Sequence, residues 1–370
     1  MSKVTVRDVM DVVHRHAPPE LAMDGDVIGL QVGRLDKPVR RICLALDPSP
    51  SAIHAAISAQ SDLLFTHHAL IYRPLKVIDT STARGRALQA ALAADLAICN
   101  AHTNLDVAEG GVNDVLANLL GLQQVEVLDP LRRERLQKLV VFVPETHHEQ
   151  VLQAVCAAGA GHIGQYSHCT FSVEGQGTFL PQAGAQPFIG EVGRLERVAE
   201  VRLETVVPEP LVPSVVRAML AAHPYEEVAY DLYPLELPGK SFGIGRIGTL
   251  AEPMPLSAFS EQVRTRLGLA HIRFSGDPGM PVQRVAVLGG SGGGWAAKAL
   301  AKGADVLVTA DCSHHVVADA WDDGLAMIDA THAAMERPVL QAVQTWFNEA
   351  FGAAVQVHIA DVEEDPFRWL

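Results

Sequence analysis

Side chains that can bind metal follow four short apolar segments of this sequence. Each segment has the pattern of a buried strand, and histidines, carboxylates or both come directly after it. The four groups are Thr66-His67-His68, Asn100 to Asp106, Thr309 to His315, and Asp329 to His332 with Glu336 beyond it. Sites in open α/β sheets lie at the carboxyl ends of strands, so we expect these groups to share one pocket. Imidazole and carboxylate groups together are typical ligands of a divalent transition metal.

Each group taken alone also has an ordinary explanation. His67-His68 could be a loop pair, Asp106 could cap a helix, and Glu336 could be a carboxylate at a helix start. His314-His315 could be surface residues of a helix. Together these explanations require independent coincidences at four strand ends, so we favour the shared pocket.

Pro338 indicates how the last group is arranged. Proline is tolerated only in the first turn of a helix, so we expect a helix to begin near residues 335–337. Glu336 would then lie at or beside the helix start. His332 would lie on the turn between strand and helix rather than on a helix face.

A glycine-rich run, Gly289-Gly290-Ser291-Gly292-Gly293-Gly294, follows a predicted strand and precedes a predicted helix. Trp295 stands where a dinucleotide fingerprint would need its third glycine, and the Lys-Ser or Lys-Thr pair of a phosphate loop is absent. The run therefore predicts a tight turn with close backbone approach. An anion held by its amides is the alternative.

The order of predicted elements indicates an α/β core in two halves with a different domain between them. Short apolar strands alternate with helices from residue 41 to 120, and the same alternation returns from residue 285 to 359. Residues 136–236 instead follow the order strand–helix–strand, strand–helix–strand, which is typical of a ferredoxin-like (α+β) domain. We expect residues 1–130 and 240–370 to form the discontinuous core and residues 131–239 to form the insert.

Composition excludes several classes of protein. The chain has 370 residues, of which 43 are acidic and 29 basic, and the net charge of −14 argues against a protein that binds nucleic acid or an anionic membrane. It has no run of about 18 apolar residues that would form a transmembrane helix. Residues 1–13 lack the apolar stretch of a signal peptide.

The cysteines predict a reducing compartment. Their number, five, is odd, their spacing is wide, and no pair has metal-ribbon spacing. We therefore expect a cytoplasmic protein without disulfides. Cys99 and Cys312 lie near the predicted pocket, and we interpret both as packing residues.

Several segments resemble the Nif-three-like family, also known as the GTP cyclohydrolase 1 type 2 homologues. The most recognisable run is His102-Thr103-Asn104-Leu105-Asp106, followed by Gly110-Gly111-Val112-Asn113-Asp114. Thr66-His67-His68 resembles a second signature. Thr309-Ala310-Asp311 with His315 resembles a third, in which Ala310 replaces a glycine. His332-x-x-x-Glu336-Arg337-Pro338 resembles the last ligand signature, and Asp365-Pro366-Phe367 resembles the family's C-terminal ending.

The resemblance implies a metal set and an assembly. It implies a homohexamer with two divalent metal ions per subunit, and its ligands correspond to His67, His68, Asp106, His332 and Glu336. The middle segment, with Gly159 to Gly164 and His223 to Glu227, resembles the PII/CutA-like domain that is inserted in longer members. The residue types suit Zn, Fe, Mn or Co equally.

The leading functional hypothesis is a metal-dependent hydrolase that acts on a nucleotide or a similar small molecule. Asp106 or Glu336 would bridge the metals, and we assign catalytic roles to His315, as acid/base or substrate-orienting group, and to Asp311. The family name suggests ring opening of GTP. The alternative is a non-catalytic metal-binding or regulatory protein whose insert binds an effector or a partner. A third hypothesis, a DNA-linked role, is disfavoured by the charge of −14.

Overall fold

The computed structural model describes residues 3–237, 239–362 and 365–368. The chain divides into two compact units. The core unit comprises Met1–Arg132 and Phe242–Leu370, and the inserted unit comprises Arg133–Ser241. None of the helices in the described residues has the length and apolarity needed to cross a bilayer.

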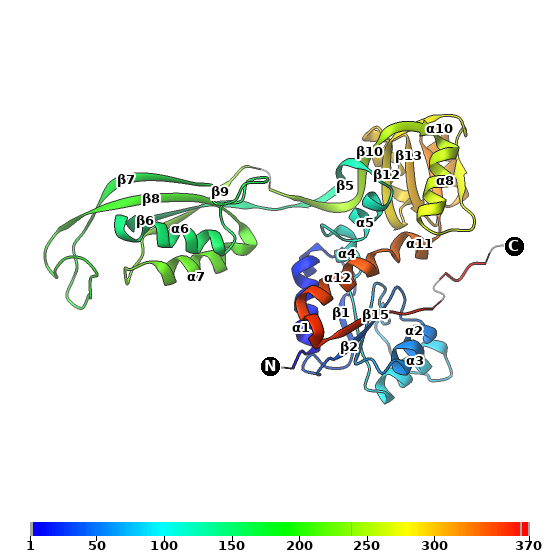
Figure 1. Ribbon diagram of the computed structural model, residues 1–370, viewed down its shortest axis with the longest axis horizontal. Helices are drawn as coiled ribbons and strands as arrows, with labels where there is room; N and C mark the ends of the chain where they lie inside the picture. Colours follow the sequence, from blue (N-terminus) through cyan, green and yellow to red (C-terminus); the bar gives the residue numbers. More distant parts are fainter. Residues whose placement is uncertain (1–2, 238, 363–364, 369–370) are drawn as a thin grey trace. The chain divides into compact units, whose positions relative to one another are not determined.

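The first sheet of the core unit is largely parallel and has the order β1-β4-β3-β2-β15. Figure 1 labels three of its strands, β1, β2 and β15. Its parallel strands are β2 (Arg41–Ala45), β3 (Leu63–Thr66), β4 (Ala97–Asn100) and β15 (Gln356–Ile359), and β1 (Gly29–Val32) is antiparallel to β4. Helices α2 (Pro50–Ser58) and α3 (Ala83–Ala93) connect the parallel strands. Their apolar residues pack on Cys43, Leu64 and Ile98, whereas the alternate residues of the strands enter the main core.

The second sheet of the core unit has the order β11-β14-β13-β12-β10-β5. Strands β12 (Pro281–Ser291), β13 (Val306–Ala310) and β14 (Ala326–Ala330) are parallel. The flanking strands are β10 (Ser241–Pro255), β11 (Arg273–Ser275) and β5 (Gln123–Arg133), of which β10 and β11 run antiparallel to their neighbours. Helices α9 (Ala296–Ala301) and α10 (His314–Asp322) connect the parallel strands.

The two sheets begin their second parallel strand in the same way. Asp62, just before β3, accepts hydrogen bonds from the backbone N–H groups of Arg40 and Arg41. Asp305, just before β13, accepts them from the N–H groups of Gln283 and Arg284. The alternation of strands and helices therefore repeats between the two sheets, and so do these hydrogen bonds.

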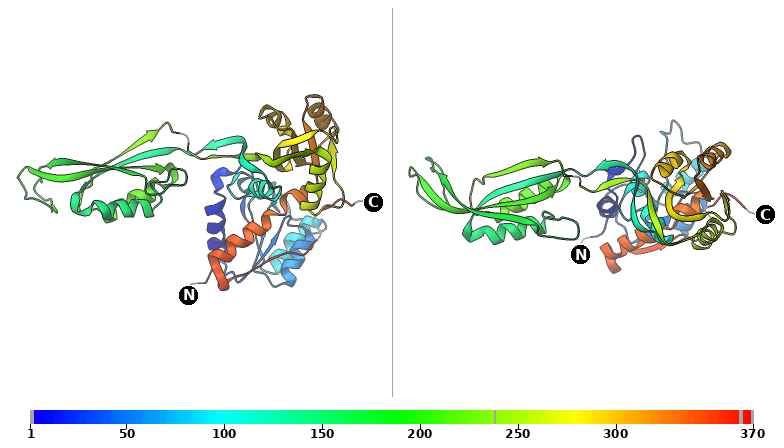
Figure 2. Two further views of the ribbon diagram at one scale, coloured as in Figure 1. Left: turned by 45° about the horizontal axis from the view of Figure 1, so that its top comes forward. Right: turned by 90° about the horizontal axis from the view of Figure 1, so that it is seen from above.

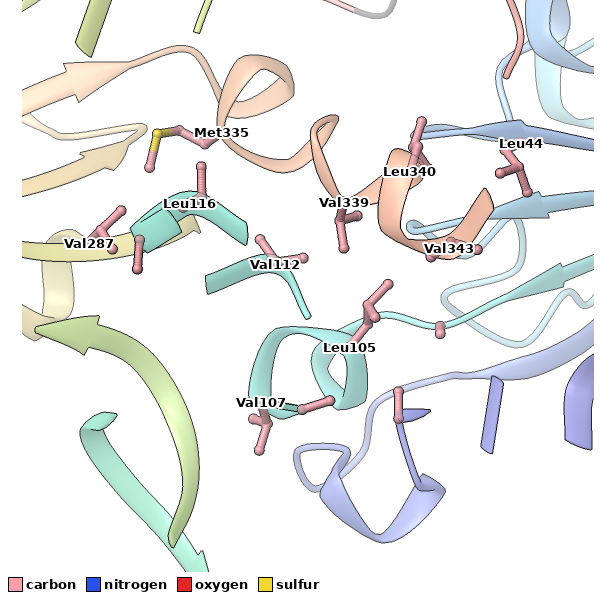
Figure 3. Packing of buried hydrophobic residues seen from close by; sticks show 14 of the residues in the cluster. Leu44, Leu105, Val107, Val112, Leu116, Val287, Met335, Val339, Leu340 and Val343 are labelled. Carbon is pink, nitrogen blue, oxygen red and sulfur yellow. The ribbon is translucent and has the colours of Figure 1, made fainter. Parts of the chain in front are cut away.

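One hydrophobic core joins both halves of the core unit. It contains Leu44 and Phe65 of the first sheet and Val287 and Val308 of the second. Helices supply the rest of this core: α1 (Val6–His16), α4 (Thr103–Val107), α5 (Val112–Leu119), α8 (Leu256–Arg266), α11 (His332–Glu336) and α12 (Val339–Phe351). Figure 3 shows side chains of α4, α5 and α12 in this interior. Burial of these apolar stripes fixes the segments that follow β4 and β14.

The inserted unit is an antiparallel sheet with helices on one face (Figure 2). Its elements follow the order β6 (Leu136–Pro144), α6 (His148–Ala157), β7 (Thr170–Phe179), β8 (Glu196–Pro208), α7 (Val212–Ala222) and β9 (Tyr230–Leu235), and the sheet order is β7-β8-β6-β9. Leu139, Val141 and Leu203 pack against Val151 and Val215 of the two helices. The alternate side chains of these strands point to the other face of the sheet.

The expected mixed α/β architecture with several sheets is confirmed. The expectation for Pro338 is wrong in detail. His332 is the first residue of α11 and Glu336 is its last, because the Thr331 side chain accepts from Ala334 N and caps the helix start. Pro338 is instead the N-cap of the following helix, α12. His332 and Glu336 thus lie four residues apart on one short helix, where side chains face each other.

Candidate metal centre

Histidines and carboxylates from the ends of three parallel strands meet inside the core unit. His67 and His68 come directly after β3, His102 and Asp106 belong to the start of α4 after β4, and His332 and Glu336 lie on α11 after β14. Their nitrogen and oxygen ligand atoms form three overlapping groups, each with all atoms within 4.8 Å of one another. The groups are His67, His68 and His102; His68, His332 and Glu336; and His67, Asp106 and Glu336.

Glu336 occupies a central position in this cluster. Its Oε2 atom lies 3.1 Å from His68 Nε2, 3.0 Å from His332 Nε2 and 3.7 Å from His67 Nε2. Asp106 Oδ1 lies 3.6 Å from His67 Nε2. Side chains from both halves of the core unit therefore contribute to a single polar cluster.

A hydrogen bond made by Nδ1 orients each of the four imidazole rings of the cluster. His67 Nδ1 donates to the carbonyl of Ala101 at 3.0 Å, and because a carbonyl can only accept, the lone pair of this neutral ring lies on Nε2. The other three rings pair Nδ1 with a carboxylate: His68 with Asp47 at 2.8 Å, His102 with Asp26 at 2.8 Å, and His332 with Asp311 at 2.6 Å. Such partners are the usual outer support of metal-binding histidines.

Several atoms of the cluster are buried without a hydrogen-bond partner. Within the described part of the chain, the atoms in this condition include His67 Nε2, Asp106 Oδ1 and Glu336 Oε2. Burying a polar atom without a partner costs about 1–3 kcal/mol, so such atoms are rare unless something binds them. The donor set therefore fits the divalent metal ions that the sequence resemblance implies.

Burial and mutual charge shift the pKa values of the most buried members. Burial, together with the neighbouring rings of His68 and His102, lowers the pKa of His67 to about 3. Burial and the Glu336 carboxylate raise the pKa of Asp106 well above its usual value. Burial would also raise the pKa of Glu336, but the His67, His332 and His68 rings outweigh it and hold that pKa well below its usual value.

His68 and His332 shift in the opposite direction from His67. Burial alone would lower the pKa of His68, but the hydrogen bond to Asp47 and the neighbouring Glu336 carboxylate raise it to about 10. The adjacent Glu336 carboxylate is the main reason that the pKa of His332 rises to about 9, with Asp311 adding to it. Both rings therefore interact strongly with the acidic groups of the cluster.

The glycine run approaches this cluster closely. Gly290, in β12, has a φ of +66°, and a Cβ atom added there would stand 2.3 Å from Glu336 Oε1. The same Cβ would lie 3.3 Å from His332 Nε2. The predicted close backbone approach therefore occurs beside the carboxylate that the three histidines surround.

Comparison with known proteins identifies the family. A model of the Duf34/NIF3 (NGG1p interacting factor 3) family matches residues 4–366. The chain belongs to this family. The resemblance expected from the sequence is thereby confirmed.

Curated and solved relatives cover the whole chain. The GTP cyclohydrolase 1 type 2 homolog of Halalkalibacterium halodurans is 46% identical over 365 residues, 98% of each sequence. Its namesake from Bacillus subtilis is 45% identical over 371 residues, 99% of each. The chain is also similar to the crystal structure of a Bacillus cereus protein related to NIF3, with a TM-score of 0.94, 46% identity and complete coverage of both chains.

The two residues with predicted catalytic roles, Asp311 and His315, differ in their relation to the cluster of this NIF3-family chain. Asp311 hydrogen-bonds to His332 Nδ1, so it orients a member of the cluster. His315 is exposed near the start of α10, where its ring contacts that of His314 at a centroid distance of 5.4 Å. Among the described residues, His315 belongs to none of the three possible metal-binding groups. Its catalytic role stays a prediction.

Some members of the cluster were absent from the predicted ligand set. His102 contributes a ring nitrogen to the group with His67 and His68. Its position four residues before Asp106 was the available signal, because the His332 and Glu336 pair has the same spacing. Asp26 and Asp47 carried no such signal, since their partners lie far away in the sequence.

A cavity of about 660 Å³ opens beside the histidines. His68, His102, Asp26 and Asp47 are among the residues that line it. Tyr72 and Arg84 line it too, with the Arg84 guanidinium 4.4 Å from the centre of the Tyr72 ring. This volume is in the usual range for a small-molecule site. Cys99 and Cys312 are buried and lie outside its lining, in keeping with packing roles.

Proposed function

We propose that this NIF3-family chain binds two divalent metal ions and acts as a hydrolase of the GTP cyclohydrolase type. The observation that carries the proposal is the convergence of imidazole and carboxylate groups on Glu336, with buried atoms of three of them left without hydrogen-bond partners. The names of the curated relatives support a GTP-related substrate.

The metal ligands in this proposal are His67, His68, Asp106, His332 and Glu336, with His102 added. Glu336 belongs to two of the three groups, which favours it over Asp106 as the shared carboxylate. Ala101, Asp26, Asp47 and Asp311 hold the rings through Nδ1 and leave Nε2 available. The residue types suit Zn, Fe, Mn or Co.

When bound, the ions would supply Lewis acidity that makes water a nucleophile near neutral pH. The chain's own groups bind and orient the substrate. Arg84, in the cavity beside His68, offers a guanidinium that can pair with a phosphate. The exposed ring of Tyr72 offers a face on which a base can stack. Both features fit a nucleotide.

Two structural inferences belong to the same proposal. We infer that the inserted unit is an independent ferredoxin-like domain, since its element order and the sheet order β7-β8-β6-β9 agree with that pattern. We also infer a homohexamer, as the family resemblance implies.

The first experiment is metal analysis by elemental mass spectrometry on untagged protein, beside a His332→Ala/Glu336→Ala double variant. We expect about two metals per chain in the parent and a clear loss in the variant. The metal-loaded parent is then incubated with GTP, and formate release is measured, with the double variant as control. A parent that holds no metal after reconstitution under reducing conditions would contradict the metal assignment.

The second candidate function is a metal-binding regulatory protein without catalysis. A separate ligand-sized cavity in the inserted unit favours it. Metal-loaded protein that turns over neither GTP nor other nucleotides would support this alternative over the hydrolase.

A further inference from the structure

The inserted unit contains a cavity of about 770 Å³ that has no part in the metal centre. Phe142 and Arg202 line it from the strand positions that alternate with the helix-facing residues Val141 and Leu203. Segments after β7 and around residues 225–229 complete the lining. The volume suits a drug-sized organic molecule.

A buried carboxylate, that of Glu200 on β8, lines this cavity. Glu200 is 9% exposed, and its Oε1 atom accepts a hydrogen bond from the Tyr225 hydroxyl at 3.0 Å. In the part of the chain that the structure describes, no lysine, arginine or histidine lies within ion-pair distance of it. A buried carboxylate without a cationic partner is costly, so its presence beside a cavity points to a cationic ligand.

Glycine provides the space that this carboxylate occupies. A Cβ atom on Gly177 of β7 would stand 2.0 Å from Glu200 Oε2. Gly175, directly opposite Glu200 in the strand register, also lines the cavity. The absence of side chains at these positions keeps the carboxylate beside open volume.

Aromatic rings form much of the remaining wall. The centroid of the Tyr225 ring lies 5.9 Å from that of Phe179 and 6.3 Å from that of Phe188. Phe142 lies beneath the Arg202 guanidinium at 5.7 Å. Aromatic faces attract cations and also bury apolar surface.

The charge of the lining has the same sign as Glu200. Glu174, Glu226 and Glu227 are the other acidic residues there, and Arg202 is the basic one among the described lining residues. Arg202 already donates to Glu204 at 2.8 Å. A metal ion is a poor occupant, because none of the possible metal-binding groups in the described residues lies here and the walls are aromatic.

We propose that this cavity binds a small organic cation, an ammonium group carried on an apolar or aromatic body. The ammonium group pairs with Glu200 beside the Tyr225 hydroxyl, and the apolar body lies against Phe179 and Phe188. The site is separate from the metal centre and does not depend on the proposed hydrolase activity.

The test compares three probes of one shape on the full-length protein by isothermal titration calorimetry near neutral pH. Phenethylamine is the cation, 2-phenylethanol is its neutral counterpart, and 3-phenylpropionate is the anion. We expect the amine to bind about tenfold more tightly than the alcohol, and the anion not to bind at millimolar concentration.

Two matched variants locate the effect. Glu200→Gln keeps an acceptor for Tyr225 and should remove the preference for the amine while the alcohol still binds, which also shows that the cavity is intact. Glu174→Gln removes the same charge from an exposed lining residue and should leave the preference almost unchanged.

Three results would overturn the proposal. The first is equal affinity for amine and alcohol, and the second is an equal loss of preference in both variants. The third is no binding of any probe at millimolar concentration.

Discussion

Gly290 and Glu336 approach so closely that a β-carbon on residue 290 would stand 2.3 Å from the Glu336 Oε1 atom. The backbone of the glycine run therefore fixes how far the central carboxylate can move away from His68 and His332. Because Gly290 also has a φ of +66°, any other residue there would be strained as well as crowded.

Gly290→Ala should displace Glu336 and lower metal affinity by about ten- to a hundredfold, the range found when groups that orient ligands are altered. Metal titration of the purified variant measures this. Gly294→Ala is the control within the same run, because its Cβ would meet nothing within 4 Å. Gly324→Ala controls for strain, since φ is +93° there and its surroundings are also open. Equal metal affinity in all three variants would contradict the prediction.

Asp311→Asn should weaken metal binding about tenfold without unfolding the chain, because the charge that supports His332 Nδ1 is lost. Asparagine tolerates the left-handed backbone at this position, where φ is +56°, so the substitution isolates the charge. Competition with a chelator measures the affinity. Asp319→Asn, an exposed residue of α10, is the matched control. If both variants bind metal like the parent, Asp311 has no supporting role.

Asp106→Asn should stabilise the metal-free protein but reduce the stability that metal adds. In the metal-free protein, Asp106 and Glu336 bring buried carboxylate oxygens within 4.8 Å of each other. Removing one charge should therefore stabilise the metal-free protein by about 1–3 kcal/mol. The parent should gain about 2.7 kcal/mol at a metal concentration a hundred times the Kd, and the variant should gain less.

Thermal unfolding with and without added metal, after chelation, tests both effects of Asp106→Asn. Asp11→Asn on the exposed side of α1 is the control and should behave like the parent in both conditions. A metal-free Asp106→Asn protein that is less stable than the metal-free parent would show that the carboxylates do not oppose each other.

The inserted unit should lose stability as the pH falls below about 6.5, through His223. His223 is buried, its Nε2 donates to the Phe142 carbonyl at 3.0 Å, and its Nδ1 accepts from Tyr225 N at 3.1 Å. Burial lowers the pKa of His223, with the nearby Glu200 opposing the shift and His147 adding to it. The unfolded chain then takes up the proton first, so stability is complete above about pH 6.5 and declines below it.

NMR titration of the His223 ring in the full-length protein measures its pKa directly, and urea unfolding at several pH values measures the stability. His223→Gln should be less stable at neutral pH but less sensitive to acid than the parent. His162→Gln, at an exposed position, should keep the parent's pH dependence. A pKa for His223 at or above the ordinary value would refute the argument.

Much of the candidate centre follows from local sequence patterns. The sequence predicts short apolar strands that are followed by His67-His68 and by the segment with His102 and Asp106. This works because the end of a strand fixes where the next side chains lie. The error at Pro338 shows the limit of local rules. Proline breaks a helix, but the sequence did not reveal that Thr331 would start a separate single-turn helix before it.

The sequence by itself determined most of the residues that could bind metal, the alternation of strands and helices, and the family to which the chain belongs. Tertiary structure decided that Glu336 lies among three histidines, that Gly290 lies against it, and that Asp26, Asp47 and Asp311 orient the rings. The reason is physical. Periodicity and capping depend on neighbours in the chain, whereas burial, ring orientation and pKa depend on side chains that only packing brings together.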